Sequence, residues 1–284
     1  MRLAFAALTA LVLTLPVPAA VHAASAAPAR ESKLPPGEDD ARAALDRSPR
    51  HGEYVSVRVP NGGATIRCWI VYPERKDKAG VVLVIHEIFG LSDWIRGLGD
   101  ALARDGFIAI VPDLISGFGP GGGGTDSVPN RDDVVKLIRN LTDEETAARL
   151  DAVRDYALHL PAANGKLATM GFCWGGARSF AYAAAPQPPE AAVVFYGTSP
   201  DSAELEQVRA PVLGLYGGDD ARVDATIEPA KRALMRLGRS YEPHLFEGAG
   251  HGFLRAQSLR DGANARATRQ AWPLAIAFLR KHLK

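Results

Sequence analysis

Apolar and polar residues alternate in the first regular part of the chain, a pattern typical of strands with one covered face. Two such runs, Tyr54–Pro60 and Thr65–Tyr72, flank the turn signal Asn61-Gly62. Asn-Gly between two alternating runs favours a tight antiparallel turn. We therefore predict an antiparallel hairpin near the start of the folded region.

Beyond residue 80 the apolar positions run continuously instead of alternating. Short continuous runs predict strands that are covered on both faces, as in a parallel sheet. These runs are Gly80–His86, Phe107–Pro112, Leu167–Gly171, Ala192–Tyr196 and Val212–Tyr216, and a later strand is expected at Glu242–Phe246.

Segments with helical patterning separate these strands. They cover roughly residues 93–103, 143–159, 175–185, 225–237 and 263–283. Strands and helices that alternate along a chain predict an α/β fold, here a three-layer α/β/α arrangement around a doubly wound, mostly parallel sheet. In such a fold the active site lies at the carboxyl ends of the strands.

Composition narrows the classes of function. The chain has 284 residues, of which 47% are hydrophobic and 23% charged, with a net charge of +1, as in ordinary globular proteins. It lacks the clusters of Lys and Arg that nucleic-acid binding requires. No His, Cys and acidic residues have the spacing of metal ligands. We expect no nucleic-acid partner, no metal and no cofactor.

The first 23 residues have the pattern of a secretory signal peptide. Met1-Arg2 precedes the apolar run Leu3–Leu15, and Val21-His22-Ala23 fits a small-x-small cleavage site. The run is too short to span a membrane, and no later stretch is long enough. We expect a periplasmic or secreted protein that is free of the membrane after cleavage; the alternative is an anchor that is retained after export.

Residues 24–50 are rich in Ala, Pro and charge, which predicts a disordered or loosely packed leader. The folded domain is then expected at residues 51–284. A glycine-rich segment at 117–125 follows a strand on the expected active-site edge. It is interpreted either as a mobile loop that borders the site or as an ordinary exposed loop.

The chain has two cysteines, which could form a disulfide in an oxidising compartment. Ile66, Cys68 and Ile70 share one face of a predicted strand, so Cys68 is more simply a core residue. The other cysteine, Cys173, lies in Gly171-Phe-Cys-Trp-Gly175, which resembles a nucleophile elbow with cysteine in place of serine. An elbow needs a strand before the nucleophile, a helix after it and small residues on both sides.

Taken alone, these five residues are more simply a buried cysteine in a glycine-rich turn. A catalytic thiol needs a base, and the base needs an orienting acid. Among seven histidines, His86 and His251 end a strand at the expected edge, and His251 has the glycines that let a loop fold back. The acid is Asp219 or Asp220, and spacing alone leaves that choice open. The order nucleophile, acid, histidine is typical of α/β-hydrolases.

An oxyanion hole requires two backbone N–H groups, one after the nucleophile and one after an early strand. Trp174 follows Cys173 directly, and Ile88 follows the strand that ends at Ile85. We expect these two residues to supply the N–H groups.

Four separated motifs resemble those of the dienelactone hydrolase family, and the match covers roughly residues 53–284. The motifs are His-Glu-Ile-Phe-Gly at 86–90, Gly-Phe-Cys-Trp-Gly-Gly at 171–176, Tyr-Gly-Gly-Asp-Asp at 216–220 and Gly-Ala-Gly-His-Gly-Phe at 248–253. The resemblance implies an α/β-hydrolase fold and a monomeric carboxylic ester hydrolase that acts on a small lactone or ester. The familiar members are cytoplasmic, whereas this chain carries an export signal.

The resemblance also implies roles for individual residues. Cys173 becomes the nucleophile, His251 the general base and Asp220 the acid. Glu87 is the carboxylate that contacts the thiol and takes its proton when substrate enters; the alternative is a cap on the following helix. A carboxylate beside a thiol raises the thiol's pKa. Because a reactive thiol outside the cytoplasm must be shielded from oxidation, Cys173 is expected to lie recessed in a narrow pocket and to be neutral at rest.

In the family, arginines pair with a carboxylate of the substrate, because a guanidinium binds a carboxylate in bidentate geometry. The resemblance places one at Arg255 and, across a gapped stretch, another at Arg131. Tyr196 corresponds to a pocket tyrosine. Each of the three could instead be an ordinary surface or rim residue.

Two hypotheses of function follow. In the first, Cys173 attacks the carbonyl of a lactone or activated ester and forms a thioester intermediate. In the second, the fold is catalytically silent and binds a small anion, although the intact elbow, base and acid argue against this. Amides and polysaccharide-linked esters stay open as substrates within the enzyme class.

Overall fold

The computed structural model describes residues 32–60 and 63–284. The predicted signal peptide, the start of the predicted leader and the Asn61-Gly62 turn therefore lie outside the described residues. Residues 34–284 form one unit built around eight strands. The strands are β1 (Gly52–Arg58), β2 (Thr65–Val71), β3 (Ala79–Ile85), β4 (Ile108–Pro112), β5 (Ala163–Phe172), β6 (Ala191–Phe195), β7 (Val212–Gly217) and β8 (Tyr241–Phe246).

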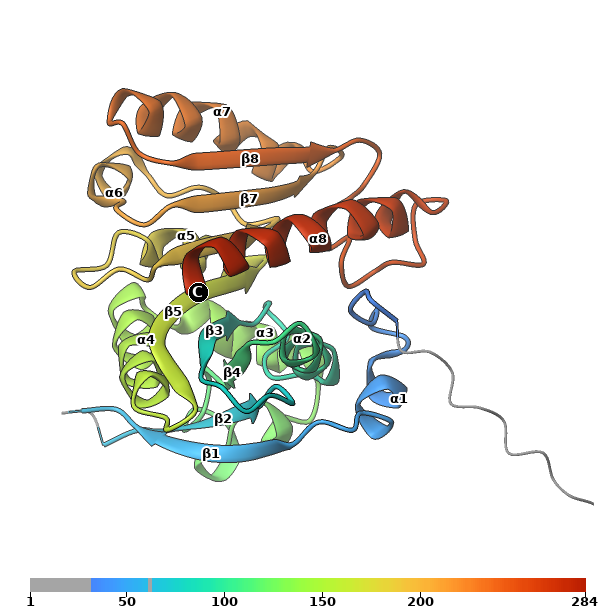
Figure 1. The fold of residues 1–284 in the computed structure, drawn as a ribbon, viewed down its shortest axis with the longest axis vertical. Helices are drawn as coiled ribbons and strands as arrows, with labels where there is room; N and C mark the ends of the chain where they lie inside the picture. The colour runs from blue at the N-terminus through green and yellow to red at the C-terminus, as the bar shows by residue number, and fades with distance from the viewer. Residues whose placement is uncertain (1–31, 61–62) are drawn as a thin grey trace, which may run out of the picture. The chain divides into compact units, whose positions relative to one another are not determined.

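The strands form one sheet in the order β1-β2-β4-β3-β5-β6-β7-β8 (Figure 1). β1 pairs with β2 and β2 with β4 in antiparallel orientation. Every other pairing is parallel, from β3 with β4 to β7 with β8. The predicted fold class is confirmed, because the hairpin adds antiparallel strands to an otherwise parallel, doubly wound sheet.

Eight α-helices and two short 3₁₀ turns connect the strands within the described residues. They are α1 (Ala41–Asp46), α2 (Asp93–Arg104), η1 (Pro120–Gly122), η2 (Thr125–Ser127), α3 (Arg131–Asn140), α4 (Asp143–Leu158), α5 (Trp174–Tyr182), α6 (Ser202–Gln207), α7 (Ala221–Arg236) and α8 (Ala263–Leu283). The patterning predicts five of these helices. It misses α1, α3 and α6, which are short or strongly charged.

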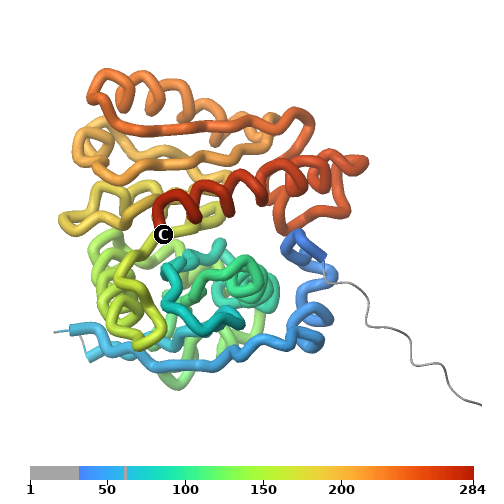
Figure 2. The backbone as a smooth tube through the Cα atoms, viewed as in Figure 1, coloured from blue at the N-terminus to red at the C-terminus, as the bar shows by residue number. Residues whose placement is uncertain are grey.

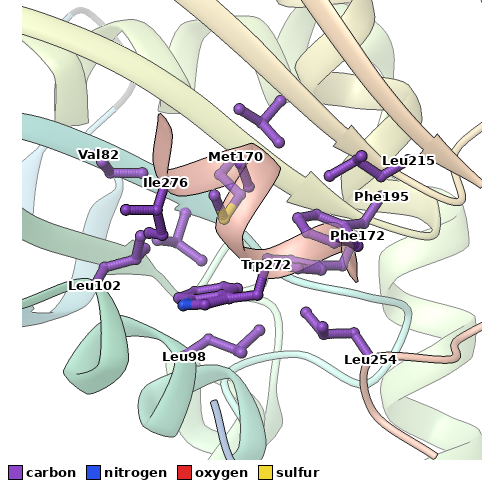
Figure 3. Close-up of a cluster of buried hydrophobic side chains, with 14 of the residues drawn as sticks. Val82, Leu98, Leu102, Met170, Phe172, Phe195, Leu215, Leu254, Trp272 and Ile276 are labelled. Carbon is purple, nitrogen blue, oxygen red and sulfur yellow. The ribbon is translucent and has the colours of Figure 1, made fainter. Parts of the chain in front are cut away.

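Successive side chains of a strand point to opposite faces, and here both faces are covered by helices. Val82 of β3 packs into a cluster with Leu98 of α2 and Trp272 of α8 (Figure 3). Its neighbour Leu83 packs on the other face, with residues of α3 and α4. Full burial of one large apolar side chain contributes about 1.5–3 kcal/mol. This two-sided burial explains why the parallel strands are continuously apolar.

Residues 34–50 differ from the predicted disordered leader. Ala41 of α1 is 1% exposed, and α1 packs against α2. Arg50 donates from Nη2 to Oδ2 of Asp100 at 2.6 Å, and both side chains are largely buried. Figure 2 shows this segment, in dark blue, beside the red loop before α8. Local sequence patterns do not indicate this docking, because it depends on partners far away in the sequence.

No helix within residues 32–60 and 63–284 is long and apolar enough to cross a membrane. The same described residues contain no group of three or more His, Cys, Asp or Glu side chains that could hold a metal ion.

Candidate active site

Cys173 lies in a strained turn between β5 and α5. Its backbone has φ 55° and ψ −116°, a conformation that a residue with a side chain rarely adopts. Two glycines let the turn form, because a Cβ on Gly171 would lie 1.8 Å from the carbonyl oxygen of Gly175, and one on Gly175 would lie 2.3 Å from that of Ile85. The strand, turn and helix have the geometry of a nucleophile elbow.

His251 links Cys173 to an acidic residue. His251 lies in the loop after β8, and its Nε2 is 3.0 Å from Sγ of Cys173. Its Nδ1 is 2.5 Å from Oδ2 of Asp220, which begins α7 directly after β7. Asp219 instead accepts from Arg260 at 2.8 Å. The geometry thus resolves the choice that spacing leaves open, in favour of Asp220.

The partners of His251 determine where its proton lies. Asp220 is 8% exposed and accepts from Nδ1, so Nε2 presents its lone pair to the thiol of Cys173. The ring of Tyr196 packs edge-on against the imidazole, with centroids 5.3 Å apart. The His251 side chain is 34% exposed, so the site opens to solvent here. This arrangement can accept a proton from the thiol.

The thiol of Cys173 is neutral at rest. Burial and, to a smaller extent, the nearby negative charge of Glu87 raise its pKa to about 11. Cys173 is partly buried, and both cysteines are free. Cys68 lies fully buried beside Ile66 and Ile70, as a core residue.

Glu87 is a buried carboxylate beside the thiol. Burial raises its pKa, and Arg255 opposes that rise by donating from Nε to Oε2 at 2.8 Å. Its second oxygen, Oε1, has no hydrogen-bond partner among the described residues. Ser92, not Glu87, caps α2, since its side chain accepts from the N–H of Ile95. The capping alternative for Glu87 is therefore excluded.

The two residues expected to form an oxyanion hole lie at the same edge of the sheet. Trp174 is the first residue of α5, and the first N–H groups of a helix have no partner within that helix. The ring of Trp174 stacks on His86, with centroids 5.8 Å apart. His86 begins the turn that contains Ile88, so the turn and the elbow adjoin.

The glycine-rich segment is attached to that turn. Asp113, directly after β4, accepts from both the backbone N–H and the hydroxyl of Thr125, at 2.7 and 2.8 Å. The same hydroxyl accepts from the N–H of Leu91 at 3.0 Å. Sequence reasoning placed the segment at this edge but missed the residues that hold it there.

The remaining predicted residues do not all face the thiol. Tyr196 is fully buried with φ 41°, and its hydroxyl lies beside the carboxylate of Glu87. Burial and the charge of Glu87 raise its pKa well above the usual value. Arg131 begins α3 and, like Arg255, bonds to Glu38. Sequence reasoning missed Glu38, which is one acidic residue among several in the predicted leader.

Comparison with known proteins agrees with this geometry. A family model described as "Dienelactone hydrolase family" matches residues 66–283. A carboxymethylenebutenolidase from Pseudomonas putida is 32% identical over 199 residues, which cover 68% of this chain and 82% of that protein.

Two solved structures have similar folds. A dienelactone hydrolase from Anabaena variabilis superposes with a TM-score of 0.61 at 25% identity, covering 83% of this chain and 99% of that one. A dienelactone hydrolase-like promiscuous phosphotriesterase from metagenomic libraries superposes with a TM-score of 0.71 at 21% identity, covering 83% and 99%. At that identity the second likeness concerns the fold alone.

Proposed function

Because the chain belongs to the dienelactone hydrolase family and is a hydrolase, we propose that it cleaves lactones or activated carboxylic esters through Cys173, His251 and Asp220. One observation carries this proposal. The imidazole of His251 bridges the thiol and the buried carboxylate, at 3.0 Å from Sγ and 2.5 Å from Oδ2. A nucleophile, a base and an orienting acid in this order are what acyl transfer requires.

In the first half of the reaction, Sγ of Cys173 bonds to the carbonyl carbon while its proton passes to Nε2 of His251, which lies 3.0 Å from Sγ, and not to Glu87, the acceptor that the family resemblance implies. The N–H groups of Ile88 and Trp174 stabilise the negative oxygen of the tetrahedral intermediate. When the intermediate collapses, the bond to the leaving oxygen breaks, and His251 returns the proton to that oxygen. The product of this half is a thioester on Cys173.

In the second half, His251 takes a proton from water, and the resulting hydroxide attacks the thioester carbonyl. Collapse releases the carboxylic acid, and the proton returns from His251 to the sulfur. Asp220 holds Nδ1–H in place and stabilises the imidazolium in both halves. Burial, assisted by the charge of Glu87, keeps the thiol protonated between turnovers, which protects it from oxidation.

Lactones and esters with good leaving groups suit this chemistry best. A thiolate is itself a good leaving group, so the tetrahedral intermediate goes forward only when the leaving oxygen departs at least as readily. Enol lactones and aryl esters meet that condition. The name of the Pseudomonas putida relative denotes a butenolide, a lactone, that carries a carboxymethylene group, and it supports lactones as the substrate class.

A hydrolysis panel with Cys173→Ala tests the proposal. We expect wild-type protein to cleave a dienelactone or an aryl ester, and Cys173→Ala to lose at least about 10⁴-fold in kcat, as other triad nucleophiles do. Cys68→Ala is the matched control and keeps its activity. Intact-protein mass spectrometry of wild type quenched during turnover detects the acyl group on Cys173. Full activity in Cys173→Ala would contradict the proposal.

We also propose that the enzyme is exported and acts as a monomer in the periplasm or outside the cell. The apolar run and small-x-small site at residues 1–23 support export. Fractionation of cells that express the full chain, with N-terminal sequencing of the product, is expected to give a mature protein that starts at Ala24. Recovery of the uncleaved chain in the cytoplasm would refute export. Sedimentation measures the mass of the mature protein in solution and so tests whether it is a monomer.

A further inference from the structure

Two arginines of the site converge on one carboxylate from the N-terminal segment. Arg255 donates from Nη1 to Oε2 of Glu38 at 2.5 Å. Arg131 donates from Nη2 to Oε1 of the same residue at 2.8 Å. Each oxygen of Glu38 therefore has its own guanidinium, which is how a pair of arginines would hold a carboxylate ligand.

This arginine pair adjoins the catalytic residues. Both guanidiniums lie over the ring of Phe89, with Cζ of Arg131 at 3.5 Å and Cζ of Arg255 at 5.1 Å from the ring centroid. Phe89 follows Ile88 in the turn after β3. Arg255 also bonds to Glu87, the carboxylate that raises the pKa of the Cys173 thiol. A chain of direct contacts thus connects Glu38 to the neighbour of the nucleophile.

The backbone holds Glu38 in this position. Its N–H donates to the carbonyl oxygen of Arg255 at 2.9 Å. Gln257 donates from Nε2 to the carbonyl oxygen of Pro35 at 3.1 Å, and Ser258 donates to Asp39 at 3.1 Å. On the other side α1 packs against α2. The segment is therefore anchored before and after Glu38, and its carboxylate is held ready beside the arginines.

We propose that Glu38 fills the anion-binding position of this site, so that the enzyme selects substrates whose acyl part carries no carboxylate there. An anionic substrate would have to displace Glu38 from both arginines or face it as a like charge. An uncharged lactone or ester meets neither obstacle. The inference rests on the proposed ester hydrolysis by Cys173 and specifies the substrate class for that reaction.

Two matched aryl esters test the selection. They are the 4-nitrophenyl ester of glutaric acid with its second carboxylate free, and the same compound with that carboxylate methylated. We expect wild type to prefer the neutral ester in kcat/KM. Glu38→Gln keeps the size of the side chain but removes its charge, and should shift the preference toward the anionic ester by at least about tenfold, or about 1.4 kcal/mol.

Asp39→Asn is the control, because Asp39 belongs to the same segment and pairs with Ser258 instead of an arginine. It removes one negative charge and should leave the preference unchanged. Glu38 is 36% exposed, so the glutamine variant should fold, and its thermal midpoint checks this. Glu38→Ala serves as a second variant with the same expected direction.

Calorimetric titration with glutarate gives a readout that is independent of turnover. We expect glutarate to bind Glu38→Gln at least about tenfold more tightly than it binds wild type or Asp39→Asn. Equal glutarate affinity together with an unchanged ester preference would overturn the role of Glu38. If no ester is cleaved by any variant, the proposed function fails, and the glutarate affinities still decide the role of Glu38.

Discussion

The triad and the arginine pair lie at the same edge of the sheet but are built in different ways. Cys173 directly follows β5, and Asp220 and His251 lie in the loops after β7 and β8, so the order of these strands in the sheet brings them together. Arg131 and Arg255 come from a helix start and a loop, and they meet through Glu38 of an N-terminal segment. The three residues proposed for catalysis are therefore positioned by the sheet, whereas the arginine pair and Glu38 are positioned by surface segments.

The two carboxylates nearest His251 and Cys173 are much more buried than the outer arginine of the pair. Asp220 is 8% exposed and Glu87 is 4% exposed, whereas the side chain of Arg131 is 49% exposed. A buried charge interacts strongly with its partner, so deleting the partner greatly lowers the free energy of unfolding. Exposed ion pairs contribute little to that free energy. Changes in the triad should therefore have much larger effects than changes at the exposed end of the arginine pair.

The largest effect is expected at the acid of the triad. Asp220→Asn keeps the shape of the side chain but no longer holds the correct tautomer of His251, so kcat for an aryl ester should fall about 10³–10⁴-fold. Asp219→Asn removes the neighbouring carboxylate, which pairs with Arg260, and should change kcat less than about twofold. Equal losses in the two variants would contradict the assignment of Asp220.

A second experiment asks how firmly the segment with Glu38 is attached. Asp100→Ala leaves the guanidinium of Arg50, whose side chain is 5% exposed, without its carboxylate partner. Loss of a partner from a buried pair costs about 3–5 kcal/mol in the free energy of unfolding, measured by urea denaturation. Asp46→Ala breaks the exposed pair with Arg42 and is the control, with an expected cost below about 1 kcal/mol. Similar small costs would mean that the segment adds little to the fold.

The influence of Glu87 on the thiol should be smaller but measurable. The negative charge of Glu87 disfavours the thiolate, so Glu87→Gln should lower the pKa of Cys173 from about 11. At pH 8 more thiolate is then present, and the rate of alkylation by iodoacetamide should rise about threefold to tenfold. Asp219→Asn is expected to leave the alkylation rate unchanged. A slower reaction in Glu87→Gln would reverse the sign of the proposed effect.

The smallest effect is expected at the exposed end of the arginine pair. Arg131→Ala removes a contact between side chains that are 49% and 36% exposed, so the free energy of unfolding should fall by less than about 1 kcal/mol. Urea denaturation measures it. A loss above about 2 kcal/mol would show that Arg131 supports the fold as strongly as the buried pairs do.

Much of the fold could be predicted, because the hydrophobic patterns that indicate its strands and helices lie within short stretches of the sequence. Continuous apolar runs predict the parallel strands, although β5 extends from Ala163 to Phe172 and so exceeds the predicted strand at both ends. Helix α3 was missed because half of its residues are charged; Asn130 caps it, and its buried side chains are Val134 and Ile138. A short amphipathic stripe of that kind is a weak signal without its partner surface.

More of the site could be predicted around Cys173 and His251 than around the arginine pair. The glycines around Cys173 and His251 indicate turns that approach other backbone closely. These turns could be predicted because the glycines lie within the same short motifs as Cys173 and His251. The choice of Asp220 over Asp219 depends on which of two adjacent side chains points at His251, which spacing does not contain. Glu38 had no signal, because an acidic residue in a charged segment is ordinarily solvated.

The sequence by itself predicted the α/β class, the glycine-flanked turn at Cys173 and the order in which Cys173, the acidic pair 219–220 and His251 occur along the chain. These depend on periodicity and on glycines whose steric freedom is a property of the residue itself. Only the tertiary structure decided that Asp220 holds His251, that Glu87 is buried against Arg255, and that Glu38 bridges two arginines. The physical reason is that burial and charge pairing arise between segments far apart in the chain, and they exist only once the sheet has brought those segments together.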